Sequence, residues 1–591
     1  EKMYNSGIEN KISNFPKNHF RGEREDTFMR YVIVGGVAGG RGAAARLRRL
    51  DEEAEIIMLE KGEFISFANC GLPYYLSGVI ADKEKLLVQT PQSFTGRFNV
   101  DVRIFSEVVS VDGANKTVHV KNHKDDTEYD LSYDELVLSP GAVPVVPRME
   151  ISENMPIFTL RNIPDTYAIK DYLDNNHPKT ACVIGGGFIG VEVAENLVEA
   201  GVKVTIVEGT DHIMPNIDKD MSYGLHGHVR AKGVTLATSK LAKRITSRGV
   251  ELADGGFVPC DMVIMSIGVK PATAFLQGSG VELGQRGEIL VDDYLHTNVD
   301  GIWAVGDAIG VKHFVSGRHT IIPLASPANK QARIVADNIK GRKTKYNGTQ
   351  GTSIAKVFDM TCASTGLSEK DCIALGIDYL KTFSATNSHA GYYPNPKMMT
   401  VKLVFEKESG KVLGGQIVGY DGVDKRIDVL ATAIRRGMTV CDLHELELAY
   451  APPFSSAKDP INMAGYVGEN VWLGEEKFVM FPDVLAMGDD VIKLDVRTPM
   501  EFERGSVPGF INIPLDKLRE RYTELDKSKK VYIHCQSGLR AYVACRILEN
   551  LGYDCYNIFG SWMWYTLWQA DLAATAKENE LTTNCARPEL N

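Results

Sequence analysis

Residues 30–40, RYVIVGGVAGG, decide the fold of the chain, because they predict a buried strand that runs through a Gly-rich turn into a helix. A second apolar strand, EIIMLE, ends at Glu60, about 20 residues after the turn, as in a β-turn-α-β dinucleotide unit. In such a unit, glycines let backbone N–H groups and the helix N-terminus approach a pyrophosphate, and the acid accepts hydrogen bonds from ribose hydroxyls. Val37 stands at the middle glycine of the G-x-G-x-x-G pattern, so the motif alone is weakly specific. The candidate nucleotide-binding residues are Gly35, Gly36, Gly39, Gly40 and Glu60.

Two later segments indicate that this first nucleotide is a flavin. Residues 133–142, YDELVLSPGA, predict a strand followed by a turn at Gly141. Residues 297–308, TNVDGIWAVGDA, predict a strand that ends in a Gly-Asp pair, where Asp307 would accept a hydrogen bond from a ribityl hydroxyl. An ordinary surface turn is the alternative for this pair. The three segments in this order are similar to the FAD-binding domain of flavoproteins with two dinucleotide-binding domains.

A second dinucleotide unit lies between these segments. Strand ACVIG leads into GGGFIG, then a helix, then strand KVTIVE, which ends at Glu208. All three fingerprint glycines, Gly185, Gly187 and Gly190, are present between strand and helix. A carboxylate at the end of the second strand accepts from the ribose 2′-hydroxyl and repels a 2′-phosphate, so Glu208 favours NADH, with NADPH as the other possibility. A purely structural Gly-rich turn is the alternative.

Residues 64–75, FISFANCGLPYY, place one cysteine, Cys70, shortly after the strand that ends at Glu60. Two nucleotide units imply two cofactors, and a thiol beside a flavin ring can exchange electrons with it. Cys70 is therefore the expected electron carrier after NADH and FAD. The alternative is a buried structural cysteine, since free Cys is among the most buried residue types.

With SFANCGLPYY following VIVGGVAGG, residues 29–465 resemble the pyridine nucleotide–disulfide oxidoreductases. Within them the chain is similar to the single-cysteine branch of coenzyme A (CoA)-disulfide reductases, NADH oxidases and peroxidases, and CoA persulfide reductases. The two-cysteine reductases have a C-x-x-x-x-C pattern here, which this chain lacks. Ala38 stands where peroxidases and oxidases of the branch usually have a histidine in the flavin turn, which disfavours interpretation as a peroxidase.

The resemblance implies a homodimer whose subunits share their active sites. Residues 351–465 would form the dimerisation domain, with KMMTVKLVFE and VLGGQIVGY as strands of an antiparallel sheet. In CoA-disulfide reductases one tyrosine from each of two segments reaches the reactive cysteine of the partner, which corresponds here to Tyr392 and Tyr450. Packing in the sheet or interface is the alternative for Tyr392 and its neighbour Tyr393.

The resemblance also implies a CoA site on the first helix, the cysteine loop and two later positions. Arg46 and Arg49 would bind CoA phosphates by charge-assisted hydrogen bonds, and a solvated basic helix face is the alternative for them. Arg41 departs from the small residues that are usual in the family. The implied CoA-binding residues are Gly42, Arg46, Arg49, Ser66, Asn69, Asn329 and Lys458.

Residues 487–570 resemble a rhodanese domain, because KKVYIHC predicts a strand ending at Cys535 and a helix follows. The turn from Cys535 to Arg540 would wrap backbone N–H groups around the sulfur and, with the helix N-terminus and Arg540, hold a persulfide anion. Asp495 and Arg497 belong to a structural signature of the family, and an inactive rhodanese fold is the alternative. The persulfide loop comprises Gln536, Ser537, Gly538, Leu539 and Arg540.

Composition bounds the remaining possibilities. A chain of 591 residues is too long to fold around a single hydrophobic core. A net charge of −10 without a basic stripe argues against nucleic-acid binding. Ten scattered cysteines predict no zinc spacing and suit reduced thiols in the cytoplasm. No apolar run reaches the ~20 residues of a membrane span.

The expected fold class is α/β, with two Rossmann-like dinucleotide-binding domains, an α+β dimerisation domain and a C-terminal α/β rhodanese domain. The predicted boundaries are a flexible extension at 1–28, an FAD-binding domain at 29–147 and 276–350, an NAD(H)-binding domain at 148–275, a dimerisation domain at 351–470, a linker and rhodanese domain at 471–574, and a tail at 575–591.

These features predict an FAD-dependent NADH:CoA persulfide or polysulfide reductase that uses one redox-active cysteine and is coupled to rhodanese sulfur transfer. CoA-disulfide reduction and NADH oxidation are the alternatives of the same class. A non-enzymatic redox sensor whose rhodanese domain docks a partner is the alternative from another class. The predicted catalytic residues are Cys70, Cys535, Tyr392 and Tyr450.

Overall fold

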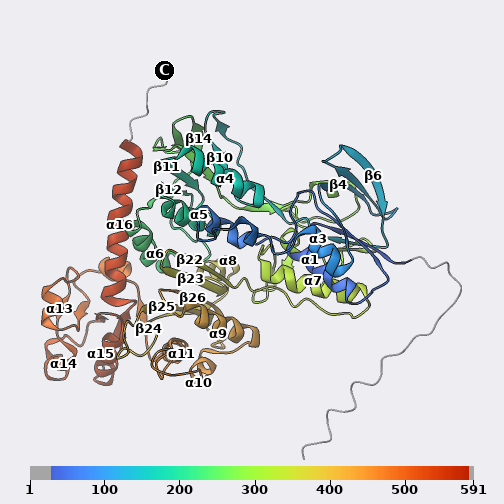
Figure 1. The fold of residues 1–591 in the computed structure, drawn as a ribbon. Coiled ribbons are helices and arrows are strands. Elements are labelled where there is room, and N and C mark those ends of the chain that lie inside the picture. Colours follow the sequence, from blue (N-terminus) through green and yellow to red (C-terminus); the bar gives the residue numbers. More distant parts are fainter. Residues whose placement is uncertain (1–27, 585–591) are drawn as a thin grey trace, which may run out of the picture.

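The computed structural model describes residues 28–584, and its first α/β unit is built from two separate stretches of chain (Figure 1). Its five-stranded parallel sheet has the order β19-β7-β1-β2-β3. Strand β19, from the second stretch, pairs with β7 of the first stretch, and β7 pairs with β1. Helices α1 (Ala38–Arg48) and α7 (Ala325–Ile339) pack against each other beside this sheet. The strands are β1 (Arg30–Val34), β2 (Glu55–Leu59), β3 (Asp101–Arg103), β7 (Glu135–Leu138) and β19 (Ile302–Ala304).

The second α/β unit repeats this design. Its parallel sheet has the order β10-β17-β11-β12-β13, and its inner strands are buried along almost their whole length, as expected for a sheet covered on both faces. The strands are β10 (Ile157–Phe158), β11 (Thr180–Ile184), β12 (Lys203–Glu208), β13 (Thr235–Thr238) and β17 (Met262–Met265). The helices are α4 (Ile163–Asn176), α5 (Phe188–Glu199) and α6 (Lys219–Ala231).

The third unit is an antiparallel sheet of order β22-β23-β26-β25-β24, in which β25 and β26 are the two antiparallel strands that the sequence predicts. The strands are β22 (Ser353–Val357), β23 (Met360–Gly366), β24 (Tyr379–Asn387), β25 (Met398–Glu406) and β26 (Val412–Gly419). The helices are α9 (Val423–Arg436), α10 (Val440–Glu445) and α11 (Pro460–Trp472).

A buried cation joins the second and third units. The ammonium of Lys402, on β25, is fully buried and lies 2.8–2.9 Å from carboxylates of Asp218, Asp220 and Glu369. Burial alone would raise the pKa of Glu369, but the charges and hydrogen bonds of Lys402 and Lys381 together outweigh burial and lower it to about 2. Removing one member of such a buried ionic group costs about 3–5 kcal/mol, so Lys402 holds these two units in a fixed relation.

The last α/β unit has a parallel sheet of order β27-β31-β30-β28-β29. Its strands are β27 (Phe478–Val479), β28 (Ile492–Asp495), β29 (Ile511–Asn512), β30 (Val531–His534) and β31 (Cys555–Ile558). Its helices are α12 (Phe481–Leu485), α13 (Pro499–Glu503), α14 (Leu515–Arg521) and α15 (Leu539–Asn550). The four units together confirm the predicted fold class.

Helix α16 (Ser561–Asn584) differs from the predicted tail, because residues 575–584 continue the helix (Figure 1). It packs along α6 of the second unit, where Asp571 lies 2.8 Å from His226 and 2.5 Å from Arg230. Glu578 adds a second ion pair with Arg230 at 2.8 Å. Glu578 looks like part of a solvated tail in sequence because its partner, Arg230, lies 348 residues earlier.

The remaining residues of the two predicted terminal segments, 1–27 and 585–591, lie outside the described part of the chain. Within residues 28–584, no helix combines the length and the apolar character that crossing a bilayer requires.

Candidate active sites

The turn between β1 and α1 is packed so closely that side chains are excluded from it. A Cβ on Gly40 would lie 1.8 Å from the carbonyl oxygen of Gly35, and one on Gly35 would lie 2.1 Å from that of Ser139. Gly39 is closed in the same way by the Ser139 hydroxyl, at 2.5 Å. This backbone contact brings the N-terminus of α1 to the end of the sheet, where a pyrophosphate can bind N–H groups.

Val37 is accommodated because it does not need the freedom of glycine. Its φ is −97°, which any residue can adopt, and it precedes α1 without capping it through a side chain. Glu60 instead orders the turn, accepting from the N–H groups of Gly36 and Gly62 at 2.9 Å each. The described residues therefore fit a dinucleotide at this turn, despite the incomplete motif.

The β11–α5 turn has the same construction. A Cβ on Gly190 would lie 1.9 Å from the carbonyl oxygen of Gly185, whose φ is +107°. Gly187 has no atom within 4 Å of its Cβ position, which leaves space for a ligand to approach the backbone. The buried carboxylate of Glu208 accepts from the N–H groups of Gly186 at 2.6 Å and Thr210 at 2.7 Å. These residues fit a second dinucleotide.

One cavity of about 1800 Å³ connects the β11–α5 turn with the cysteine loop and with Asp307 of the first unit. Cys70 and Asp307 line it from the first unit, and Gly185, Gly187 and Glu208 line it from the second. Single-ligand pockets usually measure roughly 300–1,000 Å³, so this cavity is large enough for more than one nucleotide.

Cys70 lies in a short 3₁₀ turn (Asn69–Gly71) and is exposed towards the cavity. Burial by the cavity walls and then the charges of Glu192 and Asp307 raise the pKa of its thiol, while Arg161 partly offsets them. Arg161 itself forms an ion pair with Asp307 at 3.1 Å. The cavity thus surrounds one thiol with both a cation and acids.

Arg161 and Glu192 are absent from the sequence-based prediction of the site. Both line the cavity, and burial followed by repulsion from Glu195 raises the pKa of Glu192 to about 7. Glu192 can therefore bind or release a proton near neutral pH. An acidic pair inside an apolar helix, VEVAENL, was the available signal for Glu192, whereas nothing local marks Arg161.

The predicted CoA-binding residues fall into several places. Asn69 lines the cavity, whereas Lys458 lies in the third unit with its ammonium 5.3 Å from the ring centre of Tyr466. Ser66, in the cysteine loop, is buried, and its Oγ has no hydrogen-bond partner among the described residues. The other four belong to α1, its C-terminal cap and α7: Gly42, Arg46, Arg49 and Asn329.

Residues on the α1–α7 face differ in their availability to a ligand. Arg46 is largely buried and forms an ion pair with Asp337 at 2.7 Å. Arg49 and Asn329 are exposed, and Gly42 lets the two helices approach, since its Cβ would lie 2.9 Å from that of Ala332.

Tyr392 and Tyr450 meet on the surface of the third unit. Their hydroxyl oxygens are 2.9 Å apart, and the side chains are 76% and 48% exposed. They come from two loops that are 58 residues apart in sequence. Neither lines the cavity of Cys70 in the same chain.

The loop after β30 surrounds the sulfur of Cys535. The N–H of Gly538 donates to its Sγ at 3.1 Å, and the Ser561 hydroxyl lies 3.8 Å from the same sulfur. Arg540 is held by Glu501 in a two-point ion pair of 2.7 and 2.8 Å, so this arginine does not point freely into the loop. Glu501 and Ser561 are site residues that the local Cys535 motif could not reveal, because other elements contribute them.

A buried polar cluster of Asp495, Arg497 and His534 lies next to Cys535. Arg497 and Asp495 form an ion pair at 2.6 Å, and Nε2 of His534 lies 3.3 Å from Asp495. Burial lowers the pKa of His534 to about 4 and so keeps its ring neutral. The structural role predicted for Asp495 and Arg497 agrees with this position.

The chain matches known protein families along most of its length. Residues 29–332 match the pyridine nucleotide-disulphide oxidoreductase family, residues 352–460 match its dimerisation domain, and residues 484–567 match the rhodanese-like domain. The chain is 36% identical to coenzyme A disulfide reductase of Staphylococcus epidermidis over 436 residues, which cover 74% of this chain and 98% of that protein.

Two solved structures resemble more than nine-tenths of the chain. The reduced CoADR-RHD of Bacillus anthracis is 48% identical with a TM-score of 0.90, covering 93% of this chain and 99% of that one. An NAD-dependent persulfide reductase of A. fulgidus is 35% identical with a TM-score of 0.86, covering 91% and 100%. The chain therefore belongs to the pyridine nucleotide-disulphide oxidoreductase family, with a rhodanese-like domain at its C-terminal side.

Proposed function

We propose that this protein uses NADH to reduce CoA persulfides and CoA disulfides at Cys70, and that its rhodanese-like domain supplies sulfane sulfur through Cys535. One observation carries the proposal: Cys70 is exposed to a cavity that is also lined by Gly185, Gly187 and Glu208 of the second dinucleotide unit and by Asp307 of the first. None of the other described cysteines lines that cavity. Relatives named as a coenzyme A disulfide reductase and a persulfide reductase support this substrate class.

FAD, the cofactor of this family together with NAD(P)H, supplies the two-electron relay between NADH and the sulfur site. Glu60 and Asp307 would hold the flavin nucleotide, and Glu208 would hold the nicotinamide nucleotide, each by carboxylate hydrogen bonds to sugar hydroxyls. The chain's own contribution is to place both nucleotides against one thiol.

Cys70 reacts as a thiolate, the nucleophilic form of a thiol. Burial and the nearby acids raise the pKa of this thiol, and the positive charge of Arg161 offsets part of that rise. The thiolate attacks the CoA-bound sulfur of a CoA persulfide, forming a Cys70–S–S–CoA bond and releasing hydrosulfide. With CoA disulfide the same attack releases CoA thiolate. Two electrons and one proton then convert the mixed disulfide to Cys70 thiolate and CoA thiol, so both routes balance.

The Tyr392–Tyr450 pair would act on the partner's Cys70 in a homodimer. The two hydroxyls are exposed and hydrogen-bonded to each other. This arrangement suits a proton donor for the thiolate that is released at the active site of the other subunit. The match to a dimerisation domain supports the dimer.

Cys535 would receive a sulfur atom before the reduction begins. Its thiolate attacks a polysulfide, which becomes one sulfur shorter, and Cys535 becomes a persulfide. CoA thiolate then takes the outer sulfur, giving CoA persulfide and regenerating Cys535 thiolate. Donation from Gly538 N–H favours negative charge on this sulfur. Nine free cysteines in the described chain suit a reducing compartment such as the cytoplasm.

Glu208→Gln tests nucleotide selection. Because the variant removes the charge and keeps the shape, kcat/KM with NADPH relative to NADH should rise at least about tenfold. Steady-state kinetics with both nucleotides measure the ratio, with Glu199→Gln, exposed at the end of α5, as the matched control. An unchanged ratio would remove Glu208 from nucleotide selection.

Cys70→Ser and Cys535→Ser should separate the two sulfur steps. Cys70→Ser should lower NADH-dependent reduction of CoA disulfide and CoA persulfide at least about 10³-fold while FAD stays bound. Cys535→Ser should leave CoA-disulfide reduction within about twofold of the parent, because that substrate reaches Cys70 directly. It should lower sulfur transfer and polysulfide-dependent NADH oxidation at least about tenfold.

The control for these variants is Cys372→Ser, a buried cysteine outside both sites. If Cys70→Ser retained near-parental turnover, the proposed chemistry would be wrong. If Cys535→Ser kept parental activity with polysulfide while Cys70→Ser lost reductase activity, the proposed sulfur transfer through Cys535 would be wrong. The proposed reduction at Cys70 would remain supported.

Mixed dimers test whether the tyrosine pair acts across subunits. Cys70→Ser chains and Tyr392→Phe/Tyr450→Phe chains are combined in equal amounts, refolded or co-expressed, and assayed for CoA-disulfide reduction. About a quarter of parental activity should return, because half of the random dimers are mixed and each mixed dimer has one complete site. Activity no higher than that of the separate variants, in a sample shown to contain mixed dimers, would contradict sharing.

A further inference from the structure

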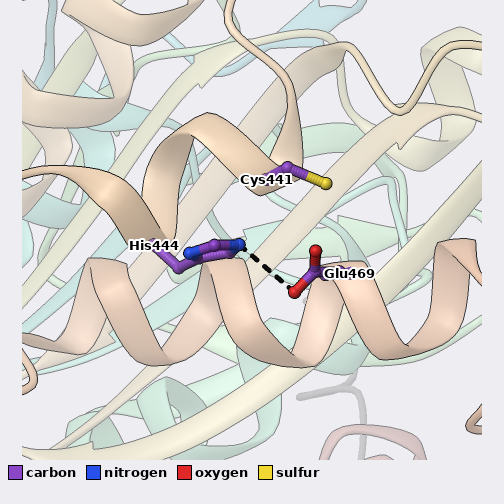
Figure 2. A group of neighbouring side chains, drawn as sticks. All are labelled: Cys441, His444 and Glu469. Carbon is purple, nitrogen blue, oxygen red and sulfur yellow. Dashed lines mark ion pairs between the residues drawn. The ribbon is translucent and has the colours of Figure 1, made fainter.

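Three side chains with different metal-binding atoms meet between α10 and α11, far along the chain from both cysteine sites (Figure 2). The sulfur of Cys441, a ring nitrogen of His444 and a carboxylate oxygen of Glu469 all lie within 4.8 Å of one another. Figure 2 shows the His444 and Glu469 side chains directed towards each other, with Cys441 beside them. Cysteine spacing could not predict this group, since it contains one cysteine only.

The first two ligands come from one short, well-anchored helix. Thr439 caps α10 through a reciprocal capping box with Asp442, which fixes where the helix begins. Cys441 and His444 are three residues apart, so they lie on the same helix face.

The third ligand depends on an unusually close approach of α11. A Cβ on Gly465 would lie 2.7 Å from the backbone nitrogen of His444, and one on Gly468 would lie 2.8 Å from a methyl group of Val440. The Asn462 amide also donates to the carbonyl oxygens that end α10, including that of Leu446 at 2.9 Å. These contacts bring Glu469 to His444, with Oε2 3.2 Å from Nε2.

The imidazole of His444 is oriented before any ligand binds. It stacks on Tyr466, with ring centres 4.8 Å apart and planes 9° apart. Its Nε2 is buried and makes no hydrogen bond among the described residues, although it faces Glu469. A donor atom with this orientation and no hydrogen bond is suited to metal binding.

No lysine or arginine counter-ion accounts for the cluster among the described residues. The Cys441 thiol is hydrogen-bonded to Glu469, within the cluster itself. Among the described ion pairs, Glu469 has no lysine or arginine partner. The acidic group of Asp218, Asp220 and Glu369 differs in this respect, because the ammonium of Lys402 already occupies its centre.

We propose that Cys441, His444 and Glu469 bind a divalent transition-metal ion, preferably Zn²⁺, with water as a fourth ligand. Thiolate, imidazole and carboxylate are the usual zinc ligands, with bond lengths of about 2.0–2.3 Å. In a tetrahedral site with these bond lengths two ligand atoms lie about 3.3–3.8 Å apart. The atoms of the cluster lie within 4.8 Å of one another, so binding needs side-chain movements of about 1 Å. Binding replaces the thiol proton with a sulfur–metal bond and releases that proton. The bound ion would connect α10 to α11, because two of its ligands lie on α10 and one lies on α11. Tyr466 and Lys458 lie beside it.

The test uses the full-length, FAD-loaded protein and Zn²⁺ alone. Equilibrium dialysis against buffered free Zn²⁺, followed by elemental analysis, measures zinc bound per chain. Cys441→Ser, His444→Ala and Glu469→Gln should each lose one zinc ion at a free concentration that saturates the parent, with affinity at least about tenfold lower. Glu445→Gln, an exposed acid on the same helix outside the cluster, should bind like the parent.

A second readout assigns the ion to this cluster. Alkylation followed by peptide mass spectrometry should show that Zn²⁺ protects Cys441 in the parent and in Glu445→Gln, that His444→Ala abolishes the protection, and that a chelator reverses it. Retained FAD and an unchanged melting temperature of the metal-free protein identify variants that fold. Equal zinc binding in the parent and every folded cluster variant, or alkylation of Cys441 unaffected by Zn²⁺, would overturn the proposal.

Discussion

Contact between glycine backbones is the constraint on which this structure depends most. In each dinucleotide unit the helix starts so close to its strand that no Cβ fits between Gly40 and Gly35, or between Gly190 and Gly185. This approach fixes the position of each helix N-terminus, and the N-terminus of α5 lines the cavity to which Cys70 is exposed. A larger residue at either contact would move the helix, and both the nucleotide geometry and its relation to the thiol would be lost.

The sequence predicts the local parts of this arrangement well. Strand–turn–helix patterns identify the carboxylates of Glu60 and Glu208, which the structure finds bonded to the glycine turns. The sequence cannot identify residues whose role depends on distant partners. Arg161 matters because it meets Asp307, and Glu501 matters because it holds Arg540, and neither has a local signature. Helix α16 was predicted as a tail beyond residue 574 for the same reason.

Buried ion pairs hold neighbouring domains together. Lys402 connects the second unit to the third, and Asp571 connects α16 to the second. The start of α16 lies against the sulfur loop, since Ser561 Oγ accepts from Cys535 N–H at 3.1 Å and Trp562 N–H donates to the Cys535 carbonyl at 3.0 Å. The rhodanese-like domain is thus attached through the same helix that supports its cysteine, and a freely swinging domain does not fit this attachment. A mobile carrier such as CoA would then move sulfur between the sites.

The central claim is that Cys70 forms the mixed disulfide with CoA, and mass spectrometry of that bond tests it most directly. Reduced protein, freed of excess reductant, is reacted with one equivalent of CoA disulfide without NADH, and its remaining thiols are alkylated before peptide mapping. The account predicts a CoA adduct on the peptide that contains Cys70, and removal of that adduct by NADH. A CoA adduct on another cysteine with Cys70 alkylated, or an adduct on Cys70 that NADH leaves in place, would contradict it.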